Sequence, residues 1–181
     1  MADHEAIIET GMCSTKASPL IFESREPYNA ERIHAAAIYC SDGRFGIHCD
    51  DFIHHHLKLP RYDRLVIPGG PGNLTGNLIT YREGEALTLE LRFLIDAHGL
   101  DRVVLIGHEG CAFYTQRLHI PQGEALERQR EDLRTAADRI REMSAKIEVE
   151  GFLALRREDR IVFEAVNLAV ARQRTIGTAW A

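Results

Sequence analysis

Short apolar runs alternate with amphipathic stretches along this chain, which predicts strands alternating with helices. Apolar runs at residues 33–39, 65–67 and 103–106 are too short for helices, and polar, proline or glycine residues follow each of them, as is typical of strands. The first and third runs fit buried strands. Residues 45–59, between the first two strands, predict a helix. That helix ends before Pro60, because proline cannot continue a helix.

The clearest helix lies between the second and third strands. Leu87, Leu91, Leu94 and Ile95 recur at i, i+4, i+7 and i+8, so they share one helix face. Gly99 marks the end of this helix, because glycine readily adopts the left-handed conformation found there. A strand, a helix and a strand joined by short links form a βαβ unit, and such units build parallel sheets.

A long charged helix and a strand pair follow. The helix is expected over residues 123–146, and one apolar residue in seven marks its buried stripe: Leu126, Leu133, Ile140 and Ile147. We expect it to pack on its own domain, because three heptads are the lower limit for a coiled coil. Residues 147–155 and 161–166, joined by a charged turn at 156–160, predict a closing strand pair.

These elements predict an α/β fold, with a mainly parallel central sheet flanked by helices and closed by an antiparallel edge strand. We expect residues 33–181 to form this single domain, because a chain of 181 residues suits one domain. Residues 1–32 show little periodicity and contain Pro19 and Pro27. They predict an N-terminal arm with at most one short helix.

Composition narrows the class of protein. The chain is 45% hydrophobic and carries a net charge of −5, which argues against a general nucleic-acid binder. No stretch approaches the roughly 18 apolar residues that a membrane span needs, and the acidic N-terminus lacks the features of a secretory signal. Four cysteines are too few for a disulfide scaffold. We therefore expect a cytoplasmic protein that binds neither nucleic acid nor membrane.

Metal-binding residue types follow two of the predicted strands. Cys40, Asp42 and Arg44 come after the first strand, and His108 and Cys111 come after the third. If these strands are neighbours in a parallel sheet, their carboxyl ends lie together and the three metal-binding side chains converge. Two thiolates and one imidazole suit zinc and leave a fourth position open, as in catalytic sites. Asp42 could occupy that position itself or pair with Arg44.

These two motifs, Cys-x-Asp-x-Arg and then His-x-x-Cys, resemble those of the β-class carbonic anhydrases. A looser resemblance covers residues 35–166, including the loop around Gly72 and Asn73 and the closing strands that begin near Gly151. The chain is a short, divergent example of the pattern. It has Gly43 where many members have serine, and Ala112 where many have glycine.

The resemblance implies reversible hydration of carbon dioxide to bicarbonate at one zinc ion per chain. Cys40, His108 and Cys111 would hold the zinc. Asp42 would accept a hydrogen bond from the water on the metal, and Arg44 would keep Asp42 away from the metal. The resemblance also implies a homodimer or a larger even-numbered assembly.

Two alternatives remain open at this stage. Asp42 could close the zinc site as a fourth ligand, which would make the protein a non-catalytic zinc-binding homologue. The same zinc site could instead hydrolyse carbonyl sulfide or carbon disulfide.

Other residues that resemble functional motifs have simpler interpretations. His54, His55 and His56 are adjacent on the predicted helix and point in different directions, so we expect a solvated face rather than a shared metal. Glu109 lies inside the second motif and is expected to form a surface hydrogen bond rather than act as an acid or base. The glycines of residues 69–76 lack the lysine of a phosphate-binding loop, so no nucleotide site is expected.

Overall fold

A five-stranded sheet, in the order β2-β1-β3-β4-β5, forms the centre of the computed structural model. Its first three pairings are parallel, and only β4 and β5 are antiparallel, which confirms the predicted fold class. The strands are β1 (Ala35–Cys40), β2 (Asp63–Ile67), β3 (Arg102–His108), β4 (Glu148–Arg157) and β5 (Arg160–Ala165).

Three α-helices connect the parallel strands, and five short helical turns extend or follow them. The helices are α1 (Gly43–Asp51), α2 (Tyr81–Leu94) and α3 (Ala125–Met143). The turns are η1 (Phe52–His56), η2 (Gly70–Thr75), η3 (Leu78–Thr80), η4 (Ile95–Gly99) and η5 (Phe113–Arg117). Among the described residues, no helix is long and apolar enough to cross a membrane.

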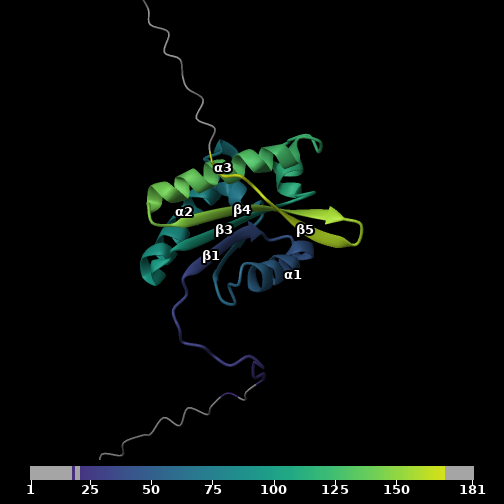
Figure 1. The fold of residues 1–181 in the computed structure, drawn as a ribbon. Coiled ribbons are helices and arrows are strands. Elements are labelled where there is room, and N and C mark those ends of the chain that lie inside the picture. The colour runs from purple at the N-terminus through teal and green to yellow at the C-terminus, as the bar shows by residue number, and fades with distance from the viewer. Residues whose placement is uncertain (1–17, 19–20, 170–181) are drawn as a thin grey trace, which may run out of the picture. The chain divides into compact units, whose positions relative to one another are not determined.

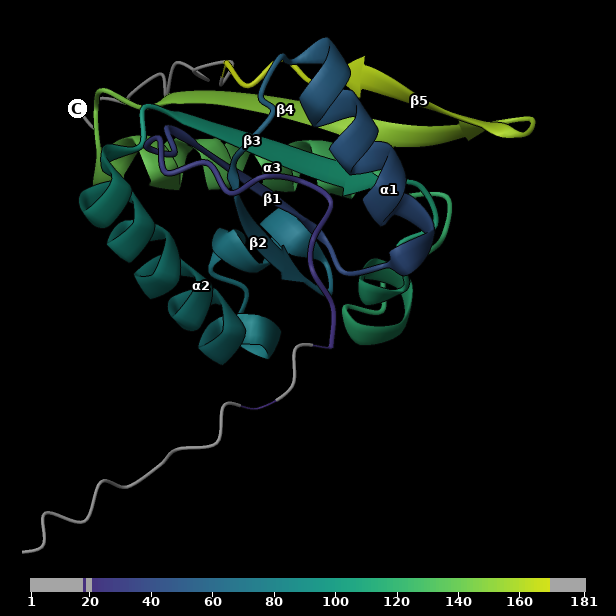
Figure 2. The same ribbon diagram turned by 90° about the horizontal axis from the view of Figure 1, so that it is seen from below.

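The helices cover both faces of the sheet, because side chains alternate between the two faces along each strand. On one face, Leu91 of α2 and Leu133 of α3 pack in a core with Ile38 of β1. On the other face, Phe45 of α1 packs in a second core with Tyr39 of β1. Figures 1 and 2 accordingly show α1 on the side of the sheet opposite to α2 and α3.

This arrangement creates a switch point between β1 and β3. The chain leaves β1 through α1 on one face and leaves β3 through α3 on the other, although the two strands are neighbours. In open α/β sheets, such a point at the carboxyl ends of the strands is the usual place for a ligand. The last residues of β1 and β3 are Cys40 and His108, so the predicted motifs meet at this point.

Most element boundaries differ from the sequence prediction by one to three residues, and two of the changes alter how an element ends. The helix predicted over residues 45–59 ends as an α-helix at Asp51 and continues only through the wider turn η1. The predicted charged turn 156–160 shortens to Glu158 and Asp159, because Arg157 and Arg160 already pair as strand residues. An edge hairpin can keep charged residues in its strands, since alternate positions face solvent.

The structure describes residue 18 and residues 21–169. The chain divides into two units, Met1–Glu31 and Arg32–Ala181, and every helix and strand above belongs to the second. Residues 21–32, which form the last part of the predicted arm, contain no helix. Most of the predicted arm lies outside the described residues, so its boundary at residue 32 stays a prediction.

Candidate metal centre

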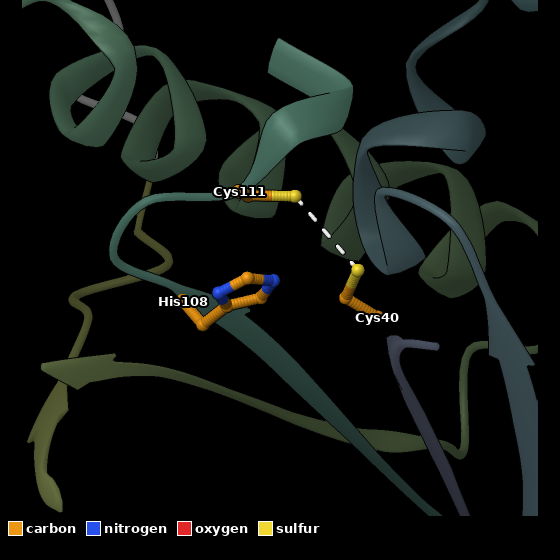
Figure 3. A group of neighbouring side chains, drawn as sticks. All are labelled: Cys40, His108 and Cys111. Atoms are coloured by element: carbon orange, nitrogen blue, oxygen red, sulfur yellow. Dashed lines mark hydrogen bonds between the residues drawn. The ribbon is translucent and has the colours of Figure 1, made fainter. Parts of the chain in front are cut away.

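Three predicted ligand residues come together at the switch point. The Sγ atoms of Cys40 and Cys111 and a ring nitrogen of His108 all lie within 4.8 Å of one another. Figure 3 shows the three side chains pointing toward one another, from the ends of β1 and β3 and from the loop before η5. Within the described part of the chain, no other group of three or more cysteine, histidine or acidic residues has this arrangement.

The distance between the sulfur atoms fits a shared metal ion. The Sγ atoms of Cys40 and Cys111 are 3.8 Å apart. A disulfide bond would need about 2.05 Å. Two sulfurs bound tetrahedrally to zinc at about 2.3 Å would lie about 3.8 Å apart. All three ligand residues are buried, with exposed fractions of 8% for Cys40 and 2% for both His108 and Cys111.

The imidazole of His108 is oriented for binding through one specific nitrogen. Its Nδ1 donates a hydrogen bond to the backbone oxygen of Glu109 at 2.9 Å, which leaves Nε2 as the nitrogen with a free lone pair. This Nε2 is buried and has no hydrogen-bond partner among the described residues. The ring of Phe45 packs on the imidazole at a centroid distance of 4.2 Å. A metal ion would satisfy the buried nitrogen, so the donor set fits zinc.

The loop after β2 closes the site beside Cys40. The N–H of Gly69 lies 3.4 Å from the Cys40 Sγ. Gly70 has a φ of +47°, and a Cβ there would lie 2.7 Å from the carbonyl carbon of Tyr39. Only glycine permits both this conformation and this approach to β1. Asn73 is buried and holds the loop by donating to the backbone oxygens of Pro68 and Gly70.

The contact between the two sulfurs also sets their protonation. The hydrogen bond between them lowers the pKa of Cys40 and raises that of Cys111. The pair thus favours the thiolate form of one sulfur, which is the form that binds metals.

Asp42 and Arg44 form an ion pair next to the candidate metal-binding group, which consists of Cys40, His108 and Cys111. Arg44 donates from Nε to Oδ1 at 2.9 Å and from Nη2 to Oδ2 at 2.5 Å, so its guanidinium engages both carboxylate oxygens. Asp42 also begins α1 by accepting a hydrogen bond from the backbone N–H of Arg44 at 3.1 Å. The hydrogen bond from the Arg44 side chain lowers the pKa of Asp42 to about 2. Asp42 is thus a carboxylate that is already paired.

The side chains of the remaining predicted residues do not join Cys40, His108 and Cys111. His54, His55 and His56 belong to η1, and His55 pairs with Asp51 at 2.9 Å. Glu109 forms the expected hydrogen bond near the surface, accepting from the backbone N–H of Arg156 at 2.8 Å.

One buried residue that contacts His108 was not predicted from the sequence. Gln129 of α3 is 2% exposed and bonds to the His108 backbone. A signal was present, because Gln129 lies on the same helix face as Leu126 and Leu133, where an apolar residue is expected.

Comparisons with known proteins indicate the family of this chain. A family model described as "Putative carbonic anhydrase" matches residues 30–163. No curated protein sequence matches the chain.

The solved structures that resemble the chain include β-carbonic anhydrases from three organisms. Isoform I from Trichomonas vaginalis is 15% identical, with 78% of this chain and 87% of that chain covered and a TM-score of 0.48. CafA from Aspergillus fumigatus is 16% identical, with coverage of 77% and 78% and a TM-score of 0.47. A tetrameric enzyme from Sordaria macrospora is 14% identical, with coverage of 74% and 81% and a TM-score of 0.45.

The family match carries the assignment, because it spans well over half of the chain and includes both metal-binding motifs. The chain therefore belongs to the carbonic anhydrase family that this model describes.

Proposed function

We propose that this protein catalyses the reversible hydration of carbon dioxide to bicarbonate with one zinc ion per chain. The observation that carries the proposal is the meeting of two sulfurs, 3.8 Å apart, with a buried imidazole nitrogen that has no partner among the described residues. Membership of the carbonic anhydrase family supports the same reaction.

In this proposal Cys40, His108 and Cys111 hold the zinc. Zinc supplies Lewis acidity, which lowers the pKa of a coordinated water from 15.7 to about 7. Two negatively charged thiolates weaken that effect relative to neutral ligands, so the surrounding residues must contribute. The burial of all three ligands excludes bulk water and strengthens each electrostatic interaction in the site.

Asp42 would accept the hydrogen bond that orients the reacting water. Its low pKa, caused by Arg44, keeps it a carboxylate over the whole physiological range, so it stays an acceptor. Oδ2 retains an acceptor position after binding Arg44, whereas Oδ1 already accepts two hydrogen bonds, because an ionised carboxylate has about four acceptor positions. Arg44 would hold Asp42 in this orientation and away from the metal.

A small cavity provides an approach for a small substrate. It has a volume of about 310 Å³ and its lining includes Arg44, Phe45 and Glu109. Arg44 is the partner of Asp42, and Phe45 packs on the ring of His108, so the cavity adjoins the proposed site. Carbon dioxide and bicarbonate are the substrates that we propose.

We also propose a cytoplasmic location, because thiolate ligands need a reducing environment, and Cys40, Cys49 and Cys111 are all free thiols. For the assembly we propose a homodimer or a larger even-numbered oligomer. The relatives from Sordaria macrospora are described as tetrameric.

The decisive experiment measures zinc content and stopped-flow carbon dioxide hydration on the same samples. The wild-type protein should contain close to one zinc per chain and hydrate carbon dioxide. Cys111→Ser should lose most of the zinc and the activity. Cys49→Ser is the matched control, because Cys49 is an equally buried cysteine that does not belong to the metal-binding group. Zinc-loaded wild-type protein without hydration activity would contradict the proposal.

A further inference from the structure

Gln129 is a buried polar residue on the face of α3 that packs against the sheet. Its exposed fraction is 2%, and its side-chain amide makes two hydrogen bonds to one residue. The backbone N–H of His108 donates to Oε1 at 2.9 Å, and Nε2 of Gln129 donates to the backbone oxygen of His108 at 3.0 Å. The Gln129 amide therefore forms hydrogen bonds with both backbone polar groups of His108, accepting through its oxygen and donating through its nitrogen.

The position of His108 in the sheet explains why its backbone needs these hydrogen bonds from Gln129. The pairing of β3 with β1 ends at Tyr39 and Ile106, two residues before His108. The next residue, Glu109, donates its N–H to Ala154 of β4. Successive strand residues direct their backbone groups to opposite neighbours, so the groups of His108 face the side where β1 has ended. Gln129 replaces the missing strand there and satisfies two buried backbone groups.

Gly107 leaves the room that the amide needs. A Cβ at Gly107 would lie 2.7 Å from Oε1 of Gln129 and 2.8 Å from Cδ2 of Leu153. A larger residue at this position would push the amide away from His108. The glycine before the metal-binding histidine and the glutamine 22 positions later thus form one structural unit.

We propose that Gln129 is a positioning residue for the metal centre. It holds the backbone of His108 at the end of β3, so that the imidazole Nε2 stays directed at the sulfurs of Cys40 and Cys111. Glu109 fixes the ring on its other side by accepting from Nδ1. This inference rests on the proposed metal site and adds a residue from a third element to it.

The test compares Gln129→Met with Ile140→Ala. Methionine has a similar volume but cannot form either hydrogen bond. Ile140 is fully buried on α3, eleven residues further along, so its truncation weakens the same helix without touching His108. The zinc dissociation constant, measured by competition with a coloured chelator, should rise about 10- to 100-fold in Gln129→Met. It should stay at the wild-type value in Ile140→Ala.

Cobalt substitution gives a second readout that a general loss of stability would not change. The thiolate-to-cobalt and d–d absorption bands report the ligand geometry, so they should shift in Gln129→Met and stay unchanged in Ile140→Ala. Hydrogen exchange at the His108 amide, measured on the metal-free protein, should be accelerated only in Gln129→Met. If that variant does not fold, Gly107→Ala provides the same test, because its Cβ displaces the amide.

Gln129→Met that binds zinc with wild-type affinity and an unchanged cobalt spectrum would overturn this inference alone. Wild-type protein that binds no metal would overturn the proposed function, and the metal-positioning role with it. In that case, accelerated exchange at the His108 amide would show that Gln129 serves the fold only.

Discussion

Replacing Asp42 tests whether its charge serves the reaction or only the fold. Asp42→Asn keeps the cap of α1, because asparagine accepts the Arg44 N–H as well as aspartate does. It loses only the charge of the ion pair. Arg44 is 74% exposed, so solvent screens the pair and its loss should destabilise the fold only slightly. Asp42→Ala also loses the cap, which costs about 1 kcal/mol.

These values separate stability from activity. For a chain of this size, 1 kcal/mol shifts Tm by about 2–4 °C, so Asp42→Ala should lower Tm by about that amount more than Asp42→Asn does. Both variants should retain close to one zinc per chain. Both should hydrate carbon dioxide about 100-fold more slowly, since each lacks the carboxylate that orients the reacting water.

The stability of the fold at low pH provides a separate check on the ion pair between Asp42 and Arg44. Because Arg44 lowers the folded-state pKa of Asp42 to about 2, the pair stabilises the fold above the unfolded-state pKa, about 4. That stabilisation is lost as the pH falls toward 2. Wild-type protein should therefore lose its stability advantage over Asp42→Asn in this range, as measured by urea unfolding at each pH.

The control variant is Asn77→Ala. Asn77 caps the short turn η3 by accepting the N–H of Ile79 at 2.9 Å, so its loss removes a cap of the same kind away from the metal centre. This variant should keep the wild-type hydration rate. Asp42→Asn that binds zinc and turns over like wild type would remove Asp42 from the mechanism.

Three further substitutions test the surroundings of the site. Arg44→Gln should release Asp42 from its ion pair, so that Asp42 can bind the metal. X-ray absorption at the zinc edge should then detect an additional oxygen ligand from the protein, and the rate of carbon dioxide hydration should fall. An unchanged spectrum would contradict the role of Arg44 in keeping Asp42 away from the metal. Gly70→Ala should lower both zinc affinity and Tm, because its Cβ would collide with the end of β1, whereas Gly43→Ala has open space and should be neutral in the same assays. Glu109→Ala should weaken zinc binding moderately by releasing the backbone N–H of Arg156, while Glu109→Gln, which still accepts that bond, should restore the affinity.

The strands, the main helices and the convergence of the ligands could be predicted from sequence. Apolar runs indicate where the strands lie, although Val66 of the edge strand β2 is exposed, and the order of strands and helices predicts parallel pairing. The convergence then needs only that the strands before Cys40 and His108 are neighbours, as β1 and β3 are. The ends of helices were harder, because the turns η1 and η4 depend on what the chain packs against after the regular helix ends.

Contacts that depend on tertiary packing could not be read from the pattern. Gly69 and Gly70 looked like a generic glycine-rich loop, but a Cβ at Gly69 would collide with the ring of Phe113, and a Cβ at Gly70 would collide with the end of β1. Gln129 is a polar residue within an apolar stripe that was not predicted to have a role. Its meaning depends on the end of β1, because only a strand that stops early leaves the His108 backbone without a partner.

The same early end of β1 links the two halves of the candidate site. After Cys40 the chain turns away, and the N–H of Ser41 donates to Ile67 of β2. Two residues later α1 begins, with Asp42 as its cap. The termination of β1 thus places a carboxylate beside the metal-binding group and, at the same time, opens the position that Gln129 fills. An insertion that lengthened β1 by two residues would remove both features, so the short strand is a requirement of the proposed site rather than a detail of the sheet.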